Sequence, residues 1–136
     1  MPLPKSLSMT VLLVDDSATL RMEARRALEI AGFDIVEACD GLDALEKLPA
    51  QAISLIVCDI NMPRMSGIEF VETLAKAGGP RPPILMLTTD GDPALVRRAK
   101  ACGARGWMIK PFKAELLVAA ARKITGAGAV AVAAAA

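Results

Sequence analysis

Short apolar runs alternate along this chain with segments in which apolar residues recur every three or four positions. Residues 11–14 and 84–87 are two such runs, and their length suits strands that are buried on both faces. In the segment after the first run, Leu20, Ala24 and Leu28 share one helix face, while charged residues occupy much of the rest. This alternation is typical of a parallel β-sheet that helices cover on both sides.

The pattern predicts five strands and five helices in turn. The predicted strands cover residues 10–15, 34–38, 53–59, 83–88 and 106–109. The predicted helices cover residues 17–31, 41–48, 66–77, 92–103 and 113–125. Ser17 stands where an N-cap is expected, and Gly32 and Gly103 stand where helices end. We therefore predict an α/β fold with a doubly wound sheet, in which all strands end at one edge.

The two ends of the chain do not fit this alternation. We expect residues 1–8 to be an N-terminal extension, residues 9–125 to form one domain, and residues 126–136 to be a frayed or disordered Ala/Gly tail. No stretch approaches the roughly 18 consecutive apolar residues of a membrane span. The N-terminus also lacks the apolar region of a signal peptide. These features predict a cytoplasmic protein without membrane contact.

Composition narrows the chemistry that the chain can perform. It contains no histidine, which excludes Ser-His and Cys-His catalytic pairs and argues against zinc. A net charge of +1 lacks the basic excess that is typical of nucleic-acid-binding domains. Cys39, Cys58 and Cys102 are too far apart for a Cys-x-x-Cys pair, and we expect them to be buried thiols. Site chemistry is therefore left to oxygens and amines.

Four predicted strands lead into residues whose side chains can bind metal ions or take part in a reaction. Asp15 and Asp16 follow the first run, Asp59 ends the third strand, Thr88 ends the fourth, and Lys110 follows the fifth. If the first and third strands are neighbours, three carboxylates meet, and like charges about 4 Å apart repel by roughly 4 kcal/mol at an effective dielectric of 20. Such a cluster needs a cation, and oxygen ligands suit Mg²⁺. Taken alone, Asp15 and Asp16 would more often be helix-capping acids than metal ligands.

In combination these residues resemble the receiver domain of two-component response regulators, and within it the stand-alone chemotaxis regulators of the CheY type. The resemblance covers about residues 8–125, so the predicted domain would be the receiver. Its motifs are Asp15-Asp16-Ser17, Gly41-Leu42-Asp43-Ala44-Leu45, Asn61-Met62-Pro63 and Gly106-Trp107-Met108-Ile109-Lys110-Pro111-Phe112. The implied fold is a flavodoxin-like (βα)5 three-layer sandwich with a parallel five-stranded sheet in the order 2-1-3-4-5.

The resemblance implies how the phosphoryl group is held. Asp59 would become 4-aspartylphosphate, Lys110 would hold the transferred group, and Thr88 would donate its switch hydroxyl to it. Trp107 would be the switch aromatic, which turns inward when Thr88 is drawn to the phosphate. Simple packing at the sheet edge is the alternative for this indole.

The resemblance also implies a Mg²⁺ cofactor. Asp16 and Asp59 would bind the ion together with the backbone carbonyl of Asn61, and Asp15 would act largely through water. Asn61 and Asp90 would tune the lifetime of the acyl phosphate. By position alone, Asp90 would instead cap the fourth helix.

The implied function is that of a single-domain response regulator, a signalling protein that catalyses only its own phosphorylation and autodephosphorylation. A sensor histidine kinase would donate the phosphoryl group. The output would be protein binding by a monomer, through the face of the fourth helix, fifth strand and fifth helix, to a target such as a flagellar motor switch protein. An alternative role is a phosphorelay intermediate or phosphate sink. No nucleic acid is expected as a partner.

Three other classes remain as rivals. A haloacid-dehalogenase-like phosphatase also phosphorylates an aspartate at a strand end, but it needs a second aspartate where this chain has Asn61. A flavodoxin-like FMN binder would need hydroxyls and free amides after Val14, where the chain has acids. The receiver half of a transcription factor is disfavoured by the end of the chain soon after Thr125.

Several surface positions bear on rates and partners rather than on the chemistry. Thr89 is bulkier than the Ala, Gly or Ser that is usual in the family beside the switch threonine. Arg64 and Ser66 occupy variable positions of the family. A basic group consists of Arg97, Arg98, Lys100 and Arg105. We interpret this group as a solvated helix face, with docking of a partner as the alternative.

Overall fold

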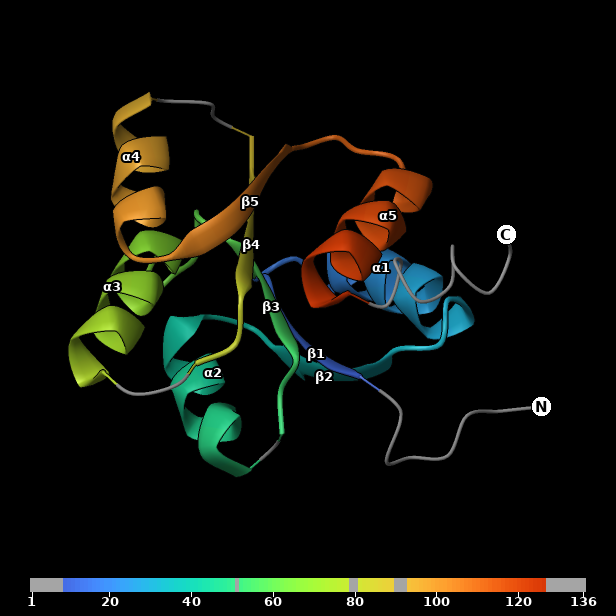
Figure 1. Cartoon of the computed structure of the whole chain (residues 1–136), viewed down its shortest axis with the longest axis horizontal. Helices are drawn as coiled ribbons and strands as arrows, with labels where there is room; N and C mark the ends of the chain where they lie inside the picture. The colour runs from blue at the N-terminus through green and yellow to red at the C-terminus, as the bar shows by residue number, and fades with distance from the viewer. Residues whose placement is uncertain (1–8, 51, 79–80, 90–92, 127–136) are drawn as a thin grey trace.

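The computed structural model describes residues 9–50, 52–78, 81–89 and 93–126 of the 136 residues. In this part of the chain five parallel strands form one sheet between two layers of helices (Figure 1). The strands are hydrogen-bonded in the order β2-β1-β3-β4-β5, which confirms the predicted topology. The Asp90 prediction and almost all of the predicted extension and tail lie outside the described residues.

The elements agree closely with those predicted. The strands are β1 (Thr10–Val14), β2 (Asp34–Ala38), β3 (Leu55–Asp59), β4 (Ile84–Thr88) and β5 (Ala104–Ile109). The helices are α1 (Ala18–Ile30), α2 (Gly41–Lys47), α3 (Gly67–Ala77), α4 (Pro93–Ala101) and α5 (Ala114–Thr125), and a 3-10 turn, η2 (Leu48–Ala50), follows α2. None of the described helices is long and apolar enough to cross a membrane.

β5 begins two residues earlier than predicted. Ile84 of β4 pairs with Ala104, whereas the next residue, Leu85, pairs with Gly106. Arg105 is therefore an extra residue in the strand, as in a β-bulge. An exposed arginine next to a glycine interrupts the apolar run, so the pattern of the sequence conceals the start of this strand.

The sheet separates two hydrophobic cores. Leu12 and Val14 of β1 face a core that α2, α3 and α4 cover, whereas Val11 and Leu13 face a core under α1 and α5. All four side chains are fully buried, as expected for a central strand with helices on both faces. With two closed cores, the strand ends are the places where polar side chains gather.

Local signals at the helix ends are present as predicted, but the cysteine prediction is partly wrong. The Ser17 hydroxyl accepts a hydrogen bond from the Leu20 N–H (3.2 Å) at the start of α1. Gly32, after that helix, has a φ of 101°. Of the thiols only Cys58 is buried, whereas Cys39 is exposed and Cys102 is half-buried, because they lie just beyond β2 and α4 and not within the sheet.

Candidate functional site

Three carboxylates meet where β1 and β3 end. The two strands are neighbours, with Val14 opposite Cys58, so the residues that follow Val14 lie beside Asp59. One carboxylate oxygen from each of Asp15, Asp16 and Asp59 lies within 4.8 Å of the other two. Asp15 and Asp59 are buried and Asp16 is exposed. The predicted juxtaposition is therefore present, with one side open to solvent.

Lys110 joins two of these carboxylates. Its Nζ donates to Asp15 Oδ2 at 2.9 Å and lies 3.3 Å from Asp59 Oδ1. The backbone N–H of Lys110 donates to the Thr88 carbonyl (2.7 Å), so the end of β4 holds the lysine in place. Burial disfavours the ammonium, but the hydrogen bond to Asp15 and the charges of both acids outweigh it and raise the pKa of Lys110.

Asp59 has contacts that favour its ionised form and surroundings that oppose it. Its Oδ1 accepts from the Ile60 N–H (2.8 Å) as well as facing Lys110. Burial and the neighbouring charge of Asp15 nevertheless raise the pKa of Asp59 above its ordinary value. A further cation would favour the ionised form of this carboxylate. The donor set consists of oxygens only, so it fits a hard ion such as Mg²⁺.

Comparison with known proteins assigns the chain to a family. The family model of the response regulator receiver domain matches residues 11–122. This chain belongs to that family. The receiver is 37% identical over 112 residues to the chemotaxis protein CheY1 of Helicobacter pylori. The aligned region covers 80% of this chain and 90% of that protein. The receiver is also 37% identical over 119 residues to a probable chemotaxis protein CheY of Rhizobium etli, and this alignment covers 86% of this chain and 92% of that protein.

The solved structures agree with this family. The receiver matches the chemotaxis protein CheY4 of Vibrio cholerae with a TM-score of 0.80 and 38% identity, over 86% of this chain and 98% of that one. Its acidic cluster lies at the carboxyl edge of the sheet, where strand order reverses between β1 and β3. Ligands of open α/β sheets bind at this position.

The two predicted switch residues of the receiver lie on β4 and β5. Thr88 is fully buried at the end of β4, one residue beyond the partner of Asp59 in the sheet. Trp107 packs its half-buried indole against the core on the α2–α4 side. Its Nε1 is buried and has no hydrogen-bond acceptor among the described residues. A buried donor without an acceptor is uncommon. In this orientation the N–H of the indole therefore lacks the hydrogen bond that it would normally form.

The loop after β3 carries the remaining predicted metal ligand of the receiver. Asn61 is exposed in this loop, two residues beyond Asp59. The Gly67 N–H donates to the Ile60 carbonyl (2.8 Å) and closes the loop at the start of α3. A Cβ at Gly67 would lie 2.1 Å from the Asp59 carbonyl oxygen, so only glycine fits there. The sequence did not mark this close approach, because Gly67 also fits the helical pattern.

Two arginines of the receiver form hydrogen bonds near the site that the sequence did not predict. Arg21 donates from Nη1 to the backbone carbonyl of Asp15 and from Nε to Glu37 (3.1 Å), although its place on α1 predicted a solvated surface charge. Arg64 in the loop after β3 donates twice to Asp40, at 2.6 and 3.0 Å. These pairs join residues far apart in the sequence, and no local pattern identifies them.

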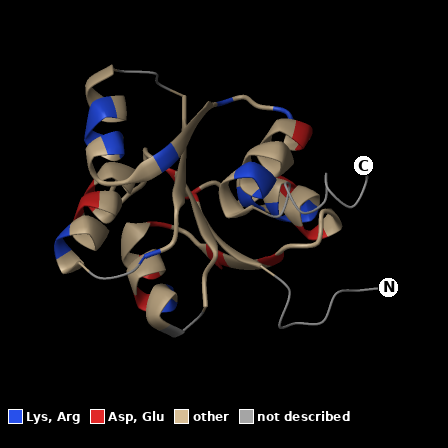
Figure 2. Cartoon of the chain, in the orientation of Figure 1, with Lys and Arg blue, Asp and Glu red and all other residues tan. Residues whose placement is uncertain are grey.

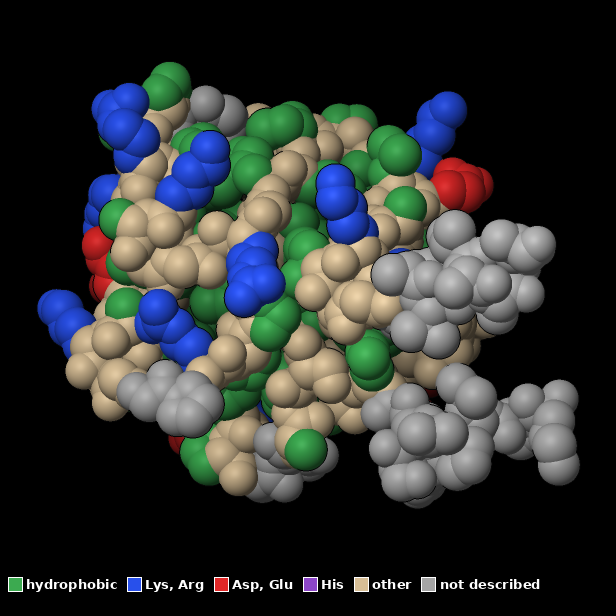
Figure 3. Space-filling view, viewed as in Figure 1, with side chains coloured by type: hydrophobic (Ala, Val, Ile, Leu, Met, Phe, Trp, Pro, Cys, Tyr) green, Lys and Arg blue, Asp and Glu red, His purple; other side chains and the backbone are tan. Residues whose placement is uncertain are grey.

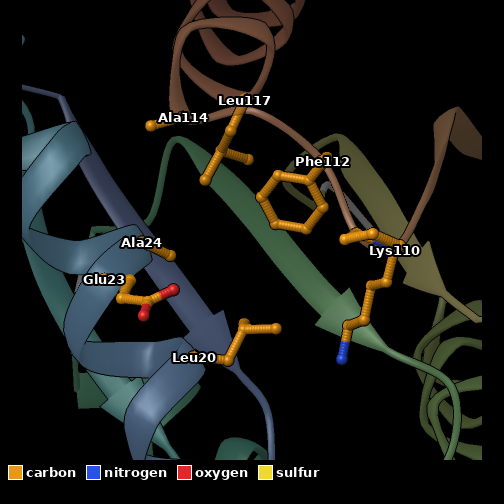
Figure 4. A pocket seen from close by; sticks show the side chains of 8 residues that line it. Leu20, Glu23, Ala24, Lys110, Phe112, Ala114 and Leu117 are labelled. Carbon is orange, nitrogen blue, oxygen red and sulfur yellow. The ribbon is translucent and has the colours of Figure 1, made fainter.

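A small apolar cavity adjoins the lysine. In Figure 4, Phe112 and Leu117 face Leu20 of α1 across this cavity, and Lys110 reaches past them toward the end of β3. The cavity has a volume of about 140 Å³, and Glu23 lies on its rim. It is the apolar side of the site, and the methylene stem of Lys110 forms part of its lining.

Basic side chains of the receiver gather away from the acidic cluster. Figure 2 shows Lys and Arg along α4, and Figure 3 shows basic side chains spread over the face on which α4 and β5 lie. Arg97, Lys100 and Arg105 are exposed, as predicted for a solvated face. Arg98 is exposed as well, and it pairs with Glu72 of α3 (2.9 Å). All four predicted surface cations are therefore exposed, and one of them also links α4 to α3.

Proposed function

We propose that this receiver accepts a phosphoryl group on Asp59 from the phosphohistidine of a sensor histidine kinase. The observation that carries the proposal is the contact of Lys110 with two of three clustered carboxylates. A lysine and a nearby hydroxyl beside an acidic cluster provide for a phosphoryl group that brings its own negative charge. This sequence contains no histidine, so the phosphohistidine of the proposed transfer lies outside it.

The transfer needs little covalent chemistry from the receiver. An Asp59 carboxylate oxygen forms the new P–O bond while the P–N bond of phosphohistidine breaks, and the imidazole leaves with the electron pair. Lys110 would shift its ammonium toward the new phosphoryl oxygens, and the Thr88 hydroxyl would donate to one of them. Mg²⁺ held by Asp16, Asp59 and the Asn61 carbonyl, with Asp15 acting largely through water, would supply positive charge where the phosphoryl group binds.

The output would be a change in protein binding on the face of α4, β5 and α5. Trp107 lies on this face and is the side chain that we propose to follow the state of Thr88. The similar chains named above are chemotaxis proteins, which supports a role in chemotaxis with a flagellar motor switch protein as target. A phosphorelay intermediate is the alternative within the same chemistry. We propose that Asn61 and Asp90 set the lifetime of the acyl phosphate.

Acetyl phosphate provides a test without any partner protein. With Mg²⁺ it should phosphorylate the purified wild-type chain, and a phosphate-affinity gel should show a shifted band. Asp59→Asn should give no shifted band while retaining the circular dichroism spectrum of the wild type. Equal labelling of the variant would place the phosphoryl group elsewhere and overturn the proposal.

A further inference from the structure

Arg64 has an unusual backbone conformation. Its φ is 63°, and it is the only non-glycine residue with a positive φ in the described part of the chain. Side chains other than those of Gly, Asn and Asp rarely adopt this region, because the Cβ approaches the backbone too closely. Residues in sparsely populated regions persist where surrounding contacts hold them. The contacts of Arg64 therefore have a consequence for the shape of its loop.

One buried carboxylate holds the arginine. Nε donates to Asp40 Oδ2 at 2.6 Å and Nη2 donates to Asp40 Oδ1 at 3.0 Å, a two-point contact with defined geometry. The Asp40 side chain is only 4% exposed, whereas that of Arg64 is 57% exposed. Asp40 also accepts from the Asp43 N–H (2.9 Å) as the N-cap of α2. Asp40 is thus the fixed partner, anchored to a helix end, and Arg64 ties the loop to it.

Packing reinforces this tie. The Met65 side chain lies against Gly41, where an added Cβ would come within 2.8 Å of it. The loop therefore contacts the start of α2 through two successive residues, Arg64 by hydrogen bonds and Met65 by packing. Asn61, three residues before Arg64, lies between this tether and the end of β3. A seven-residue connection without regular structure is thus fixed near its middle as well as at its ends.

We infer that Arg64 and Asp40 form a clamp that positions the loop after β3 for metal binding. The clamp fixes the path of the backbone that presents the Asn61 carbonyl next to Asp59. Arg64 and Asp40 are positioning residues, which act through the loop and not by touching the ion or the phosphoryl group. The inference rests on the proposed function, and it extends the site to a pair of residues 24 positions apart.

The two members of the clamp carry opposite charges. Substituting each in turn therefore distinguishes an effect of loop position on Mg²⁺ affinity from an effect of charge. Arg64→Gly removes a cation and tolerates the positive φ, whereas Asp40→Ser removes an anion and retains a hydroxyl for the α2 cap. If the pair acts by its charges, Arg64→Gly should strengthen Mg²⁺ binding and Asp40→Ser should weaken it. If the pair acts as a clamp, both variants should weaken Mg²⁺ binding by roughly tenfold, as outer-shell partners typically do.

Calorimetric titration of the full chain with Mg²⁺ tests the clamp. We expect both single variants to lose about the same affinity and the double variant to lose no more than either one, because one contact is broken in all three. Arg98→Ala is the matched control, since it removes an arginine from another ion pair, with Glu72, and should leave the affinity unchanged. The rate of labelling by acetyl phosphate should fall in parallel at low Mg²⁺ and recover at saturating Mg²⁺.

The outcomes separate the clamp from the proposed function. Unchanged Mg²⁺ affinity in both single variants, or changes of opposite sign, would overturn the clamp even if Asp59 takes the label normally. Wild-type protein that binds Mg²⁺ but takes no label would instead overturn phosphoryl transfer and leave the clamp standing. A wild type without measurable Mg²⁺ affinity would overturn the clamp as a device for metal binding.

Discussion

The connections after β1 and after β3 supply carboxylates to the same site but are built in different ways. After β1, only residues 15–17 precede α1, and one bond lies within this segment: Asp15 Oδ1 accepts from the Ser17 N–H (2.9 Å). Asp15 also donates its N–H to the Ala38 carbonyl of β2 (3.1 Å). After β3, residues 60–66 intervene, and contacts from α2 and from the start of α3 hold them. The short connection thus lies directly beside the strands and helix that hold it, whereas the long one is also held at its middle by a helix that is distant in sequence.

A substitution at the most crowded point of the connection after β3 should lower the free energy of unfolding most. In Gly67→Ala the new Cβ would lie 2.1 Å from the Asp59 carbonyl oxygen and 2.9 Å from Ile60 Cα, and backbone cannot move aside cheaply. We expect a loss of about 3 kcal/mol in the free energy of unfolding, the upper end for overpacking. Urea titration followed by circular dichroism measures this loss, and labelling by acetyl phosphate should fall with it.

Gly32→Ala is the control for this substitution. Gly32 has a positive φ, unlike Gly67, and an added Cβ there would meet no atom within 4 Å. The control should cost about 1 kcal/mol through backbone strain alone and leave phosphorylation unchanged. Equal effects of both substitutions on labelling would show that the contact with Asp59 does not matter.

Removing the ammonium of Lys110, which contacts both Asp15 and Asp59, should have the next largest effect on the free energy of unfolding. Lys110→Met leaves Asp15 and Asp59 without their shared cation, and we expect a loss of about 2 kcal/mol without Mg²⁺. Added Mg²⁺ should stabilise the variant more than the wild type, because the ion replaces the missing charge. Urea unfolding followed by Trp107 fluorescence, with and without Mg²⁺, measures both quantities. A deficit that Mg²⁺ does not reduce would argue against the acidic cluster as the metal site.

Helix caps provide a test in which the two connections should behave alike. Ser17 caps α1, and Ser66 caps α3 in a reciprocal capping box with Glu69. Both bonds are local, so Ser17→Ala and Ser66→Ala should each cost about 1 kcal/mol in thermal or urea unfolding. A much larger cost at Ser66 would mean that the cap also holds the long loop in place.

The smallest expected effect concerns the pH dependence of stability. The pKa of Asp59 is raised in the folded protein, so its contribution is fully present below the unfolded pKa of about 3.9 and is lost as pH rises through the folded value. Without Mg²⁺, Asp59→Asn should therefore be more stable than wild type at pH 7, by up to about 1 kcal/mol because solvent reaches the cluster. The gain should vanish toward pH 4 in thermal melts. A gain independent of pH would rule out charge repulsion as its cause.

The same contrast explains how much of this molecule was predictable. The five strands and the residues at their ends follow from apolar runs and caps, because these are properties of neighbouring residues. The strand order was implied by the family resemblance. The pairs Arg64–Asp40 and Arg21–Glu37 were not predicted, since each depends on which loops and strands come together in space. Gly67 was assigned to a helix by its pattern, while its tight contact with Asp59 arises only in the folded chain.

The unpaired N–H of Trp107 has a consequence for how easily this receiver changes shape. A buried donor without an acceptor raises the free energy of its conformation by about 1–3 kcal/mol. Since 1.4 kcal/mol corresponds to a factor of ten, the unpaired N–H on its own lowers the population of this orientation by roughly one to two orders of magnitude. The burial of the ring favours the inward placement and the N–H opposes it. A hydrogen bond gained elsewhere in the domain is of the same size as the cost of the unpaired N–H, so it can shift the population between placements of this ring.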